Sequence, residues 1–243
     1  MVRFFIVFFI SFSAFIYSQN SVEKSVWNKE LYEKYDEKNF IKFESFNNII
    51  NVKNIDYPLL HAGVFYYTNI ERLKRGLKPL KWSLNLEIAA YNHSKDMVKR
   101  NFFDHLSAKD VTNRGLLAGI VNPNIAENIL INNALKYKAG KVYYTHEKSS
   151  SLNGEYRFSY NDDESDLIPF HSYLSLAEEC VKSWMNSSGH KKIILSKNGL
   201  ELGVGFYLKI DDIGRPVFYG TQNFQWYKIS KITESKSPLP PGW

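Results

Sequence analysis

Two histidines and one glutamate have the side chains and the spacing for a binding or catalytic site. His105 follows one predicted helix, Glu127 follows a proline-containing loop, and His190 follows another predicted helix, later in the chain. Imidazole nitrogen is a ligand that zinc prefers, and catalytic zinc sites keep an open coordination position. The three residues therefore predict a cavity that can hold a divalent cation. The alternative is that they hydrogen-bond one another and fasten three loop ends.

No other motif in the sequence identifies a reaction. There is no Gly-rich phosphate loop, no His-Glu-x-x-His, no Gly-x-Ser-x-Gly and no cysteine pair. A hydrolase is the alternative to a binding function: His105 and His190 would hold a metal, and Glu127 would take a proton from its water. Ser107 and Ser187 lie outside any nucleophile motif and are interpreted as caps or loop residues. We expect a binding function in preference to catalysis.

Two further reactive side chains are interpreted as structural. Cys180 follows two glutamates that disfavour a thiolate, so we expect a buried free thiol. His93 shares the inner face of its predicted helix with alanines and is expected to be a hydrogen-bonded core residue.

Helical periodicity places three helices around these residues. The first begins at Tyr57 and stops before Gly76, and the second covers 84–99. A capping box of Ser175 and Glu178 predicts the start of the third, and Gly189 is expected to take a left-handed conformation after its end.

Alternation with a period of two predicts strands at 200–210 and 217–226, joined by a turn at 211–216. The tyrosine-rich stretches 141–144 and 155–160 predict an additional hairpin. Helices that precede strands, without strand-helix-strand alternation, indicate an α+β layer fold with an antiparallel sheet.

Composition and the N-terminus favour an exported protein. Residues 1–20 have one positive charge and a short apolar run, which is typical of a signal peptide cleaved near Ser18 or Gln19. The net charge of +6 comes from interspersed acidic and basic residues, which indicates a solvated surface and no nucleic-acid partner. A single cysteine allows no internal disulfide, so stability must come from a packed core.

The expected organisation has four parts. These are a signal peptide (1–18), an aromatic N-terminal segment packing on the main body (19–56), a main domain (57–230) with an inserted hairpin around 136–173, and a flexible tail (231–243).

Five motifs occur in the order seen in the CAP superfamily of cysteine-rich secretory, antigen-five and pathogenesis-related proteins. The chain resembles its bacterial SCP-like branch over roughly 59–226. The segments that carry the resemblance are His93-Ser94-Lys95-Asp96-Met97, Phe102-Phe103-Asp104-His105, Ala126-Glu127-Asn128-Ile129, Trp184-Met185-Asn186-Ser187-Ser188-Gly189-His190 and Leu202-Gly203-Val204-Gly205.

The resemblance implies an α-β-α sandwich with a central antiparallel sheet flanked by helices, secretion, and a cavity lined by His105, His190 and Glu127. Ser187 stands where the eukaryotic pattern has a second glutamate, so the acidic set is incomplete. We therefore expect zinc or another divalent metal to bind weakly, through His105 and His190.

These observations predict a secreted, periplasmic or cell-surface binding module, with no transmembrane segment after signal cleavage. Its partner would be a ligand, glycan or protein at the cell envelope. A third hypothesis makes the hairpin at 141–160 a docking surface for a protein or glycan, because exposed tyrosines suit recognition. The ordinary explanation is that these tyrosines cover the edge of a core.

Overall fold

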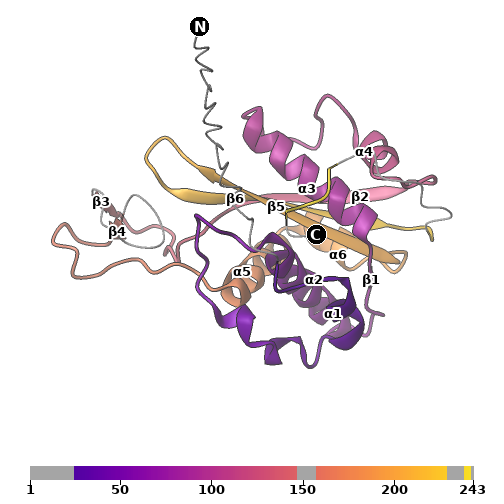
Figure 1. Ribbon diagram of the computed structural model, residues 1–243, viewed down its shortest axis with the longest axis horizontal. Helices are drawn as coiled ribbons and strands as arrows, with labels where there is room; N and C mark the ends of the chain where they lie inside the picture. The colour runs from indigo at the N-terminus through magenta and orange to yellow at the C-terminus, as the bar shows by residue number, and fades with distance from the viewer. Residues whose placement is uncertain (1–24, 147–156, 229–237, 242–243) are drawn as a thin grey trace, which may run out of the picture.

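The computed structural model describes residues 25–146, 157–228 and 238–241, so the expected signal peptide lies outside the described residues. Figure 1 shows the elements in a layered arrangement. In chain order they are α1 (Lys29–Lys34), η1 (Phe40–Lys42), η2 (Glu44–Asn47), α2 (Tyr57–Leu73), β1 (Lys81–Trp82), α3 (Leu84–Lys99), α4 (Val111–Leu117), β2 (Ile125–Asn133), β3 (Tyr144–His146), β4 (Arg157–Ser159), α5 (Tyr173–Asn186), α6 (Ser188–Ile194), β5 (Glu201–Ile210) and β6 (Pro216–Gln225).

The central sheet has the strand order β1-β5-β6-β2. β5 and β6 form the expected hairpin, with Gly214 at a φ of 78° in its turn, and β6 also pairs antiparallel with β2. The two-residue strand β1 pairs in parallel with β5, so the sheet is mixed. The α+β class is confirmed, and the parallel strand is a short addition at one edge.

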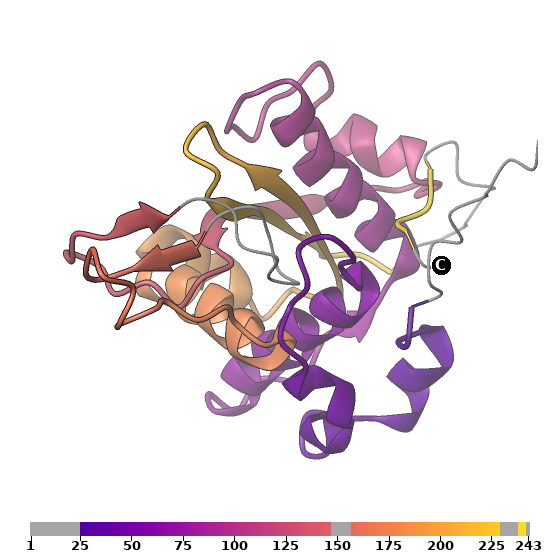
Figure 2. The ribbon, with the colours of Figure 1, turned by 60° about the vertical axis from the view of Figure 1, so that its left-hand side comes forward.

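Helices cover both faces of this sheet. α3 and α4 lie on one face, while α2 and α5 lie on the other (Figures 1 and 2). Contact between α3 and β5 is unusually close: a Cβ atom on Gly203 would lie 2.1 Å from the nitrogen of Glu87, and one on Gly205 would lie 2.0 Å from the nitrogen of Tyr91. Glycine at these two positions lets the helix backbone rest directly on the strand.

The larger core lies under α2 and α5 and includes the N-terminal segment. Trp27, Phe40 and Phe46 are fully buried there. The Trp27 ring lies 5.2 Å from that of Phe46 and 5.8 Å from that of Tyr66 on α2, in the edge-on or tilted arrangements that aromatic pairs prefer. Residues 25–56 therefore contribute directly to the core of the main domain.

Two local expectations around α5 are wrong. Its capping box is formed by Ser172 and Ser175, since the Ser172 side chain accepts from the backbone of Ser175 and the Ser175 side chain accepts from the backbone of Ser172. Gly189 does not have a positive φ. A left-handed residue is unnecessary because Ser187, in an extended conformation, both ends α5 and begins α6.

Strand β2 was also not expected. Glu127 follows the loop that contains Pro123, as expected, but it lies inside a nine-residue strand at the edge of the sheet. The segment contains three asparagines and a glutamate, which depress the strand signal that its isoleucines would otherwise give.

The tyrosine-rich segment does form a hairpin, in which β3 pairs antiparallel with β4; residues 147–156 between them lie outside the described part. It projects from the body (Figure 1). Tyr137, Tyr143 and Tyr160 pack around a small core that contains Phe158 and Ile168. The packing favours the ordinary explanation for Tyr143 and Tyr160, whereas Tyr144 is 45% exposed.

Part of the expected C-terminal tail contacts the body. Asn92 Nδ2 on α3 donates to the carbonyl oxygen of Pro238 at 3.2 Å, and Pro240 is buried. Over the described residues, no helix has the length and apolar character needed to cross a membrane.

Candidate functional site

The two histidines meet at one pocket of about 500 Å³. His105 comes from the loop after α3, His190 is the third residue of α6, and Ser187 lies between α5 and α6. Glu127, the third residue of β2, does not line the pocket. The lining residues are Phe103, Asp104, His105, Ile129, Leu130, Ser183, Trp184, Ser187 and His190.

Glu127 lies behind His105 and is 7% exposed. Its Oε1 is 3.1 Å from His105 Nδ1, and its Oε2 accepts from Arg114 Nη2 at 2.6 Å. The amide of Asn223, in the orientation that satisfies both of its polar atoms, donates to the same Oε2 at 3.1 Å. Both carboxylate oxygens are therefore engaged by protein groups.

These partners keep Glu127 ionised. Burial acts to raise the pKa of its carboxyl group, but the hydrogen bond from His105 and the charges of His93 and Arg114 outweigh burial and hold that pKa below its usual value. The resulting carboxylate accepts the Nδ1 proton of His105, which fixes the tautomer of the ring.

His105 therefore presents its second nitrogen, Nε2, as a lone-pair donor. The side chain is 54% exposed. The hydrogen bond to Glu127 raises the pKa of His105, with burial opposing it. A carboxylate behind a histidine that faces a pocket is the arrangement that orients metal-binding imidazoles.

His190 faces the same pocket, and within the described residues its ring makes no hydrogen bond. Burial lowers its pKa, and the charge of His105 lowers it further, which places the two rings within electrostatic reach of each other. Its main chain is held in place, because Asn128 Nδ2 donates to the His190 carbonyl at 3.3 Å. Both ring nitrogens of His190 are thus available to a ligand.

A buried arginine fixes the helix that presents His190. Arg72 on α2 is 2% exposed, and its Nη1 donates to the carbonyls of Ile194 and Ser196 at 2.7 and 2.8 Å. These carbonyls lie at the end of α6, so α2 anchors α6 against the main core.

The structure adds two residues to the site that the sequence does not assign to it, Arg114 and His93. Arg114 on α4 binds Glu127 and also donates to the carbonyls of His105 and Lys109 at 3.1 and 2.7 Å. His93 is fully buried, as expected for a core residue, yet its Nε2 lies 3.1 Å from the Asp104 carbonyl and 3.6 Å from Glu127 Oε1. No sequence signal separates Arg114 from the other basic residues.

The donor set limits what metal could bind. Across the part of the chain that the structure describes, no group of three or more His, Cys, Asp or Glu side chains is arranged to hold an ion. The pocket offers two imidazoles, from His105 and His190, with the hydroxyl of Ser187 nearby on its wall. An ion held here would complete its coordination with water or with a ligand from outside.

Comparison with known proteins identifies relatives of this chain. A model of the cysteine-rich secretory protein (CAP) family matches residues 65–224, which is more than half of the chain. The uncharacterized protein YkwD of Bacillus subtilis is 29% identical over 139 residues, which cover 57% of this chain and 39% of the relative. The uncharacterized membrane protein YlbC of the same organism is 26% identical over 157 residues, covering 65% and 32%. The chain thus spans between about a third and two fifths of these relatives.

Solved structures are similar at low identity. An extracellular SCP-domain protein from Bacillus anthracis has a TM-score of 0.46 and 24% identity, covering 71% of this chain and 42% of that one. The CAP domain of enterococcal PrgA has a TM-score of 0.41 and 14% identity, covering 89% and 85%.

Proposed function

The chain belongs to the CAP family of cysteine-rich secretory proteins, and on that premise we propose that it is an extracellular binding module. Its pocket would hold a divalent cation weakly between His105 and His190, with the remaining coordination positions open to a ligand. A bound ion would supply positive charge and open positions to an electron-rich ligand group.

The single observation that supports this proposal is the hydrogen bond between Glu127 and His105 Nδ1, 3.1 Å long. This bond makes Nε2 of His105 the free nitrogen, on a ring that lines the pocket together with His190. Two imidazoles, with no protein carboxylate in direct contact with the ion, suit a weak, exchangeable zinc ion better than a permanent structural one.

Geometry gives less support to the hydrolase alternative. A general base must reach the water that it activates. Glu127 lies outside the pocket, and its two oxygens are engaged by His105 and Arg114. We therefore assign Glu127 a positioning role toward His105.

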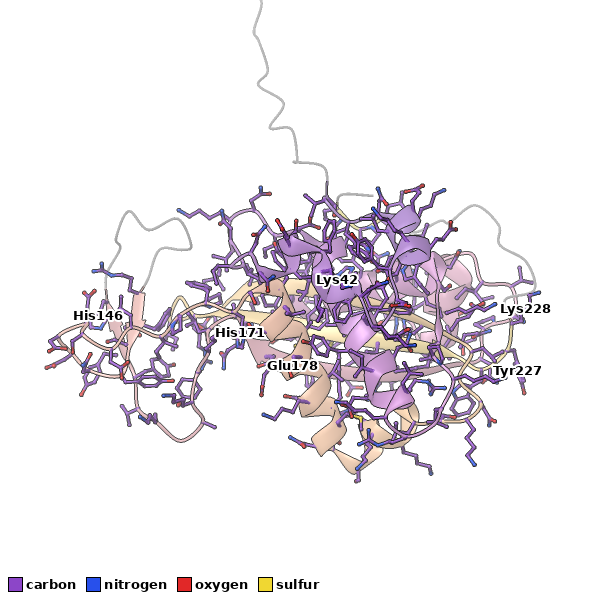
Figure 3. All side chains as sticks on the ribbon, turned by 90° about the horizontal axis from the view of Figure 1, so that it is seen from below. Lys42, His146, His171, Glu178, Tyr227 and Lys228 are labelled. Atoms are coloured by element: carbon purple, nitrogen blue, oxygen red, sulfur yellow. The ribbon has the colours of Figure 1, made fainter. Side chains whose placement is uncertain are left out.

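Calorimetric titration with zinc at pH 7.5 tests the proposal. The wild type should bind with rapid release on adding EDTA, and His105→Ala and His190→Ala should each weaken binding by at least about tenfold, or 1.4 kcal/mol. His146→Ala is the matched control, because His146 lies on the projecting hairpin, apart from the body of the molecule (Figure 3). Equal zinc binding in all four proteins would overturn the proposal.

A further inference from the structure

The free edge of β2 has main-chain groups that point away from the sheet. β2 is the last strand in the order β1-β5-β6-β2. Just beyond its two ends, the carbonyl of Asn124 accepts from Trp226 and the N–H of Ala134 donates to Pro216. Even-numbered residues therefore bond to β6, and because hydrogen bonds alternate along an antiparallel pair, the odd-numbered residues direct their N–H and C=O groups outward.

Some of these outward groups already have partners. Trp184 Nε1 donates to the Ile129 carbonyl at 3.1 Å, and the Asn133 N–H donates to Asn132 Oδ1 at 2.9 Å. The Ile129 N–H and both main-chain groups of Ile131 have no partner among the described residues. One carbonyl and two N–H groups are thus open to another chain.

The edge also lacks the usual protection against added strands. Proteins blunt exposed edges with lysine, proline or bulges. β2 contains no lysine and no proline, and it pairs with β6 in unbroken register. The Ile131 side chain is 45% exposed. An extended peptide can therefore approach this edge closely.

This open edge leads into the histidine pocket. Ile129 lines the pocket, and Glu127, two residues before it on the same edge, holds His105. Asp104 is the carboxylate that lines the pocket, and its Oδ1 accepts from the Leu106 N–H at 2.8 Å; Glu127 lies outside the pocket, behind His105. Two imidazoles in a protein of net charge +6 make the pocket at this edge suited to an anionic group.

We propose that β2 binds the C-terminal end of an extended peptide, which adds as an antiparallel strand and places its free carboxylate at His105 and His190. The inference names the ligand class for the pocket described above, so it rests on the proposed function. The peptide would end opposite Ile129, because Trp184 Nε1 already donates to the Ile129 carbonyl and the backbone hydrogen bonds of an added strand cannot continue past it. The peptide residue opposite Ile131 would exchange two hydrogen bonds with it, and the Ile129 N–H would donate a third.

The side chain opposite Ile131 should be apolar. Directly opposed residues on neighbouring strands place their side chains on the same face. On that face Ile131 is opposite Tyr219, whose ring contacts Phe103 at a centroid distance of 6.0 Å. Phe103 is 48% exposed, so an apolar peptide side chain would cover it.

Fluorescence polarisation with synthetic peptides tests this inference. The probe is a labelled pool of tetrapeptides with valine third from a free carboxyl end, measured with zinc and again with EDTA. Two control pools carry either a C-terminal amide or an N-methyl group on that valine. The pools are compared in whichever condition, zinc or EDTA, gives tighter binding of the free-carboxyl pool. In that condition we expect each control pool to bind at least about tenfold more weakly. Equal binding of the three pools, or no binding of any of them, would overturn the inference.

Variants of the edge residue separate this inference from the proposed function. Ile131→Pro removes the outward N–H without touching the ladder to β6, as proline is tolerated at an edge, and Ile131→Thr is the matched control that keeps the N–H. Ile131→Pro should lose peptide binding, keep zinc binding, and lose the peptide-induced exchange protection of the Ile129 amide. Undiminished peptide binding by a folded Ile131→Pro protein would contradict pairing at this edge. Zinc binding should be lost in His105→Ala and kept in Ile131→Pro. Zinc binding therefore tests the proposed function, and peptide binding by Ile131→Pro tests the pairing at the edge.

Discussion

At the scale of single residues, Glu127 serves two neighbours at once. Its carboxylate compensates the buried guanidinium of Arg114 and orients the exposed ring of His105. Removing its charge should therefore affect both the stability of the protein and the properties of its pocket, because the two partners share one group.

Glu127→Gln should produce both effects, and each can be measured separately. The amide keeps the volume but leaves Arg114 without its counter-charge, so the free energy of unfolding should fall by about 3 kcal/mol. Zinc affinity should fall by about tenfold as His105 loses its orienting carboxylate. Urea unfolding and calorimetry measure the two quantities. Glu178→Gln is the control, since Glu178 is exposed on α5 (Figure 3); identical behaviour of both variants would contradict the assigned role.

Two buried histidines should make the protein sensitive to mild acid. Burial lowers the pKa of His93 and of His171 to about 4, while an unfolded histidine has a pKa of about 6.5. Between these values the unfolded chain binds more protons, so their stabilising contribution is complete above pH 6.5 and is lost as the pH falls. Each accounts for about 2 to 3 kcal/mol by pH 4.5. Glu127 adds to the loss only at the acid end of this window, because its lowered pKa keeps it ionised in the folded protein while the unfolded carboxyl group begins to bind a proton.

Urea unfolding at pH 7, 5.5 and 4.5 measures this loss. His105 acts in the opposite direction, since its pKa is raised, but its side chain is half-exposed and its contribution is screened. His171→Asn should reduce the loss, because it removes one of the two buried imidazoles whose pKa folding lowers. His171 lies at the junction of the hairpin and the body (Figure 3), where its Nδ1 hydrogen-bonds Ser175. A stability that does not change from pH 7 to 4.5 would contradict this explanation.

At the scale of elements, the contact between α3 and β5 decides where the loop containing His105 begins. The helix backbone rests on Gly203 and Gly205, so its axis cannot move away without losing this direct contact between helix and strand. Ser94 adds to this contact, because its Oγ donates to the Gly205 carbonyl at 2.9 Å.

Gly205→Ala should therefore be strongly destabilising. The new methyl group would lie 2.0 Å from the nitrogen of Tyr91, a backbone atom that cannot rotate away. We expect the free energy of unfolding to fall by about 3 kcal/mol or more. Gly189→Ala is the control, because a Cβ at Gly189 meets nothing within 4 Å and alanine favours a helix. Equal stability of the two variants, measured by thermal unfolding, would show that the α3 contact is looser than described.

At the scale of the whole molecule, the core is continuous from the N-terminal segment to the helices that carry the pocket. Trp27 packs on α2, and α2 holds the end of α6 through Arg72. The chain has one cysteine, Cys180, which is buried and free, so burial and hydrogen bonding hold this arrangement together without a disulfide.

Export remains a prediction that belongs to this scale. Residues 1–18 have the composition of a cleaved signal, whereas residues from Trp27 onward pack into the core. The exported protein should therefore begin near Gln19 or Asn20, ahead of the first core residue. Mass analysis of the protein released by the producing cell measures this, and recovery of a chain that starts at Met1 would contradict signal cleavage.

Sequence patterns alone determined the elements whose signals are local. The helical periodicities of α2, α3 and α5 and the alternation in β5 and β6 can be recognised within a short window of sequence. Burial of all ten residues of β6 shows that both faces of that strand are covered. His105, His190 and Glu127 could be singled out from their side-chain chemistry, their places after predicted elements and the order of the motifs, and the burial of His93 from its helix face.

Tertiary structure alone decided how these residues act. Glu127 lies in an edge strand, its partners Arg114 and His105 lie 13 and 22 residues away, and Asn223 reaches it from another strand. Such contacts leave no periodic trace, because each requires only one residue of suitable type at one position. The open groups of Ile129 and Ile131 likewise follow from strand order, which arises from pairing between segments far apart in the chain.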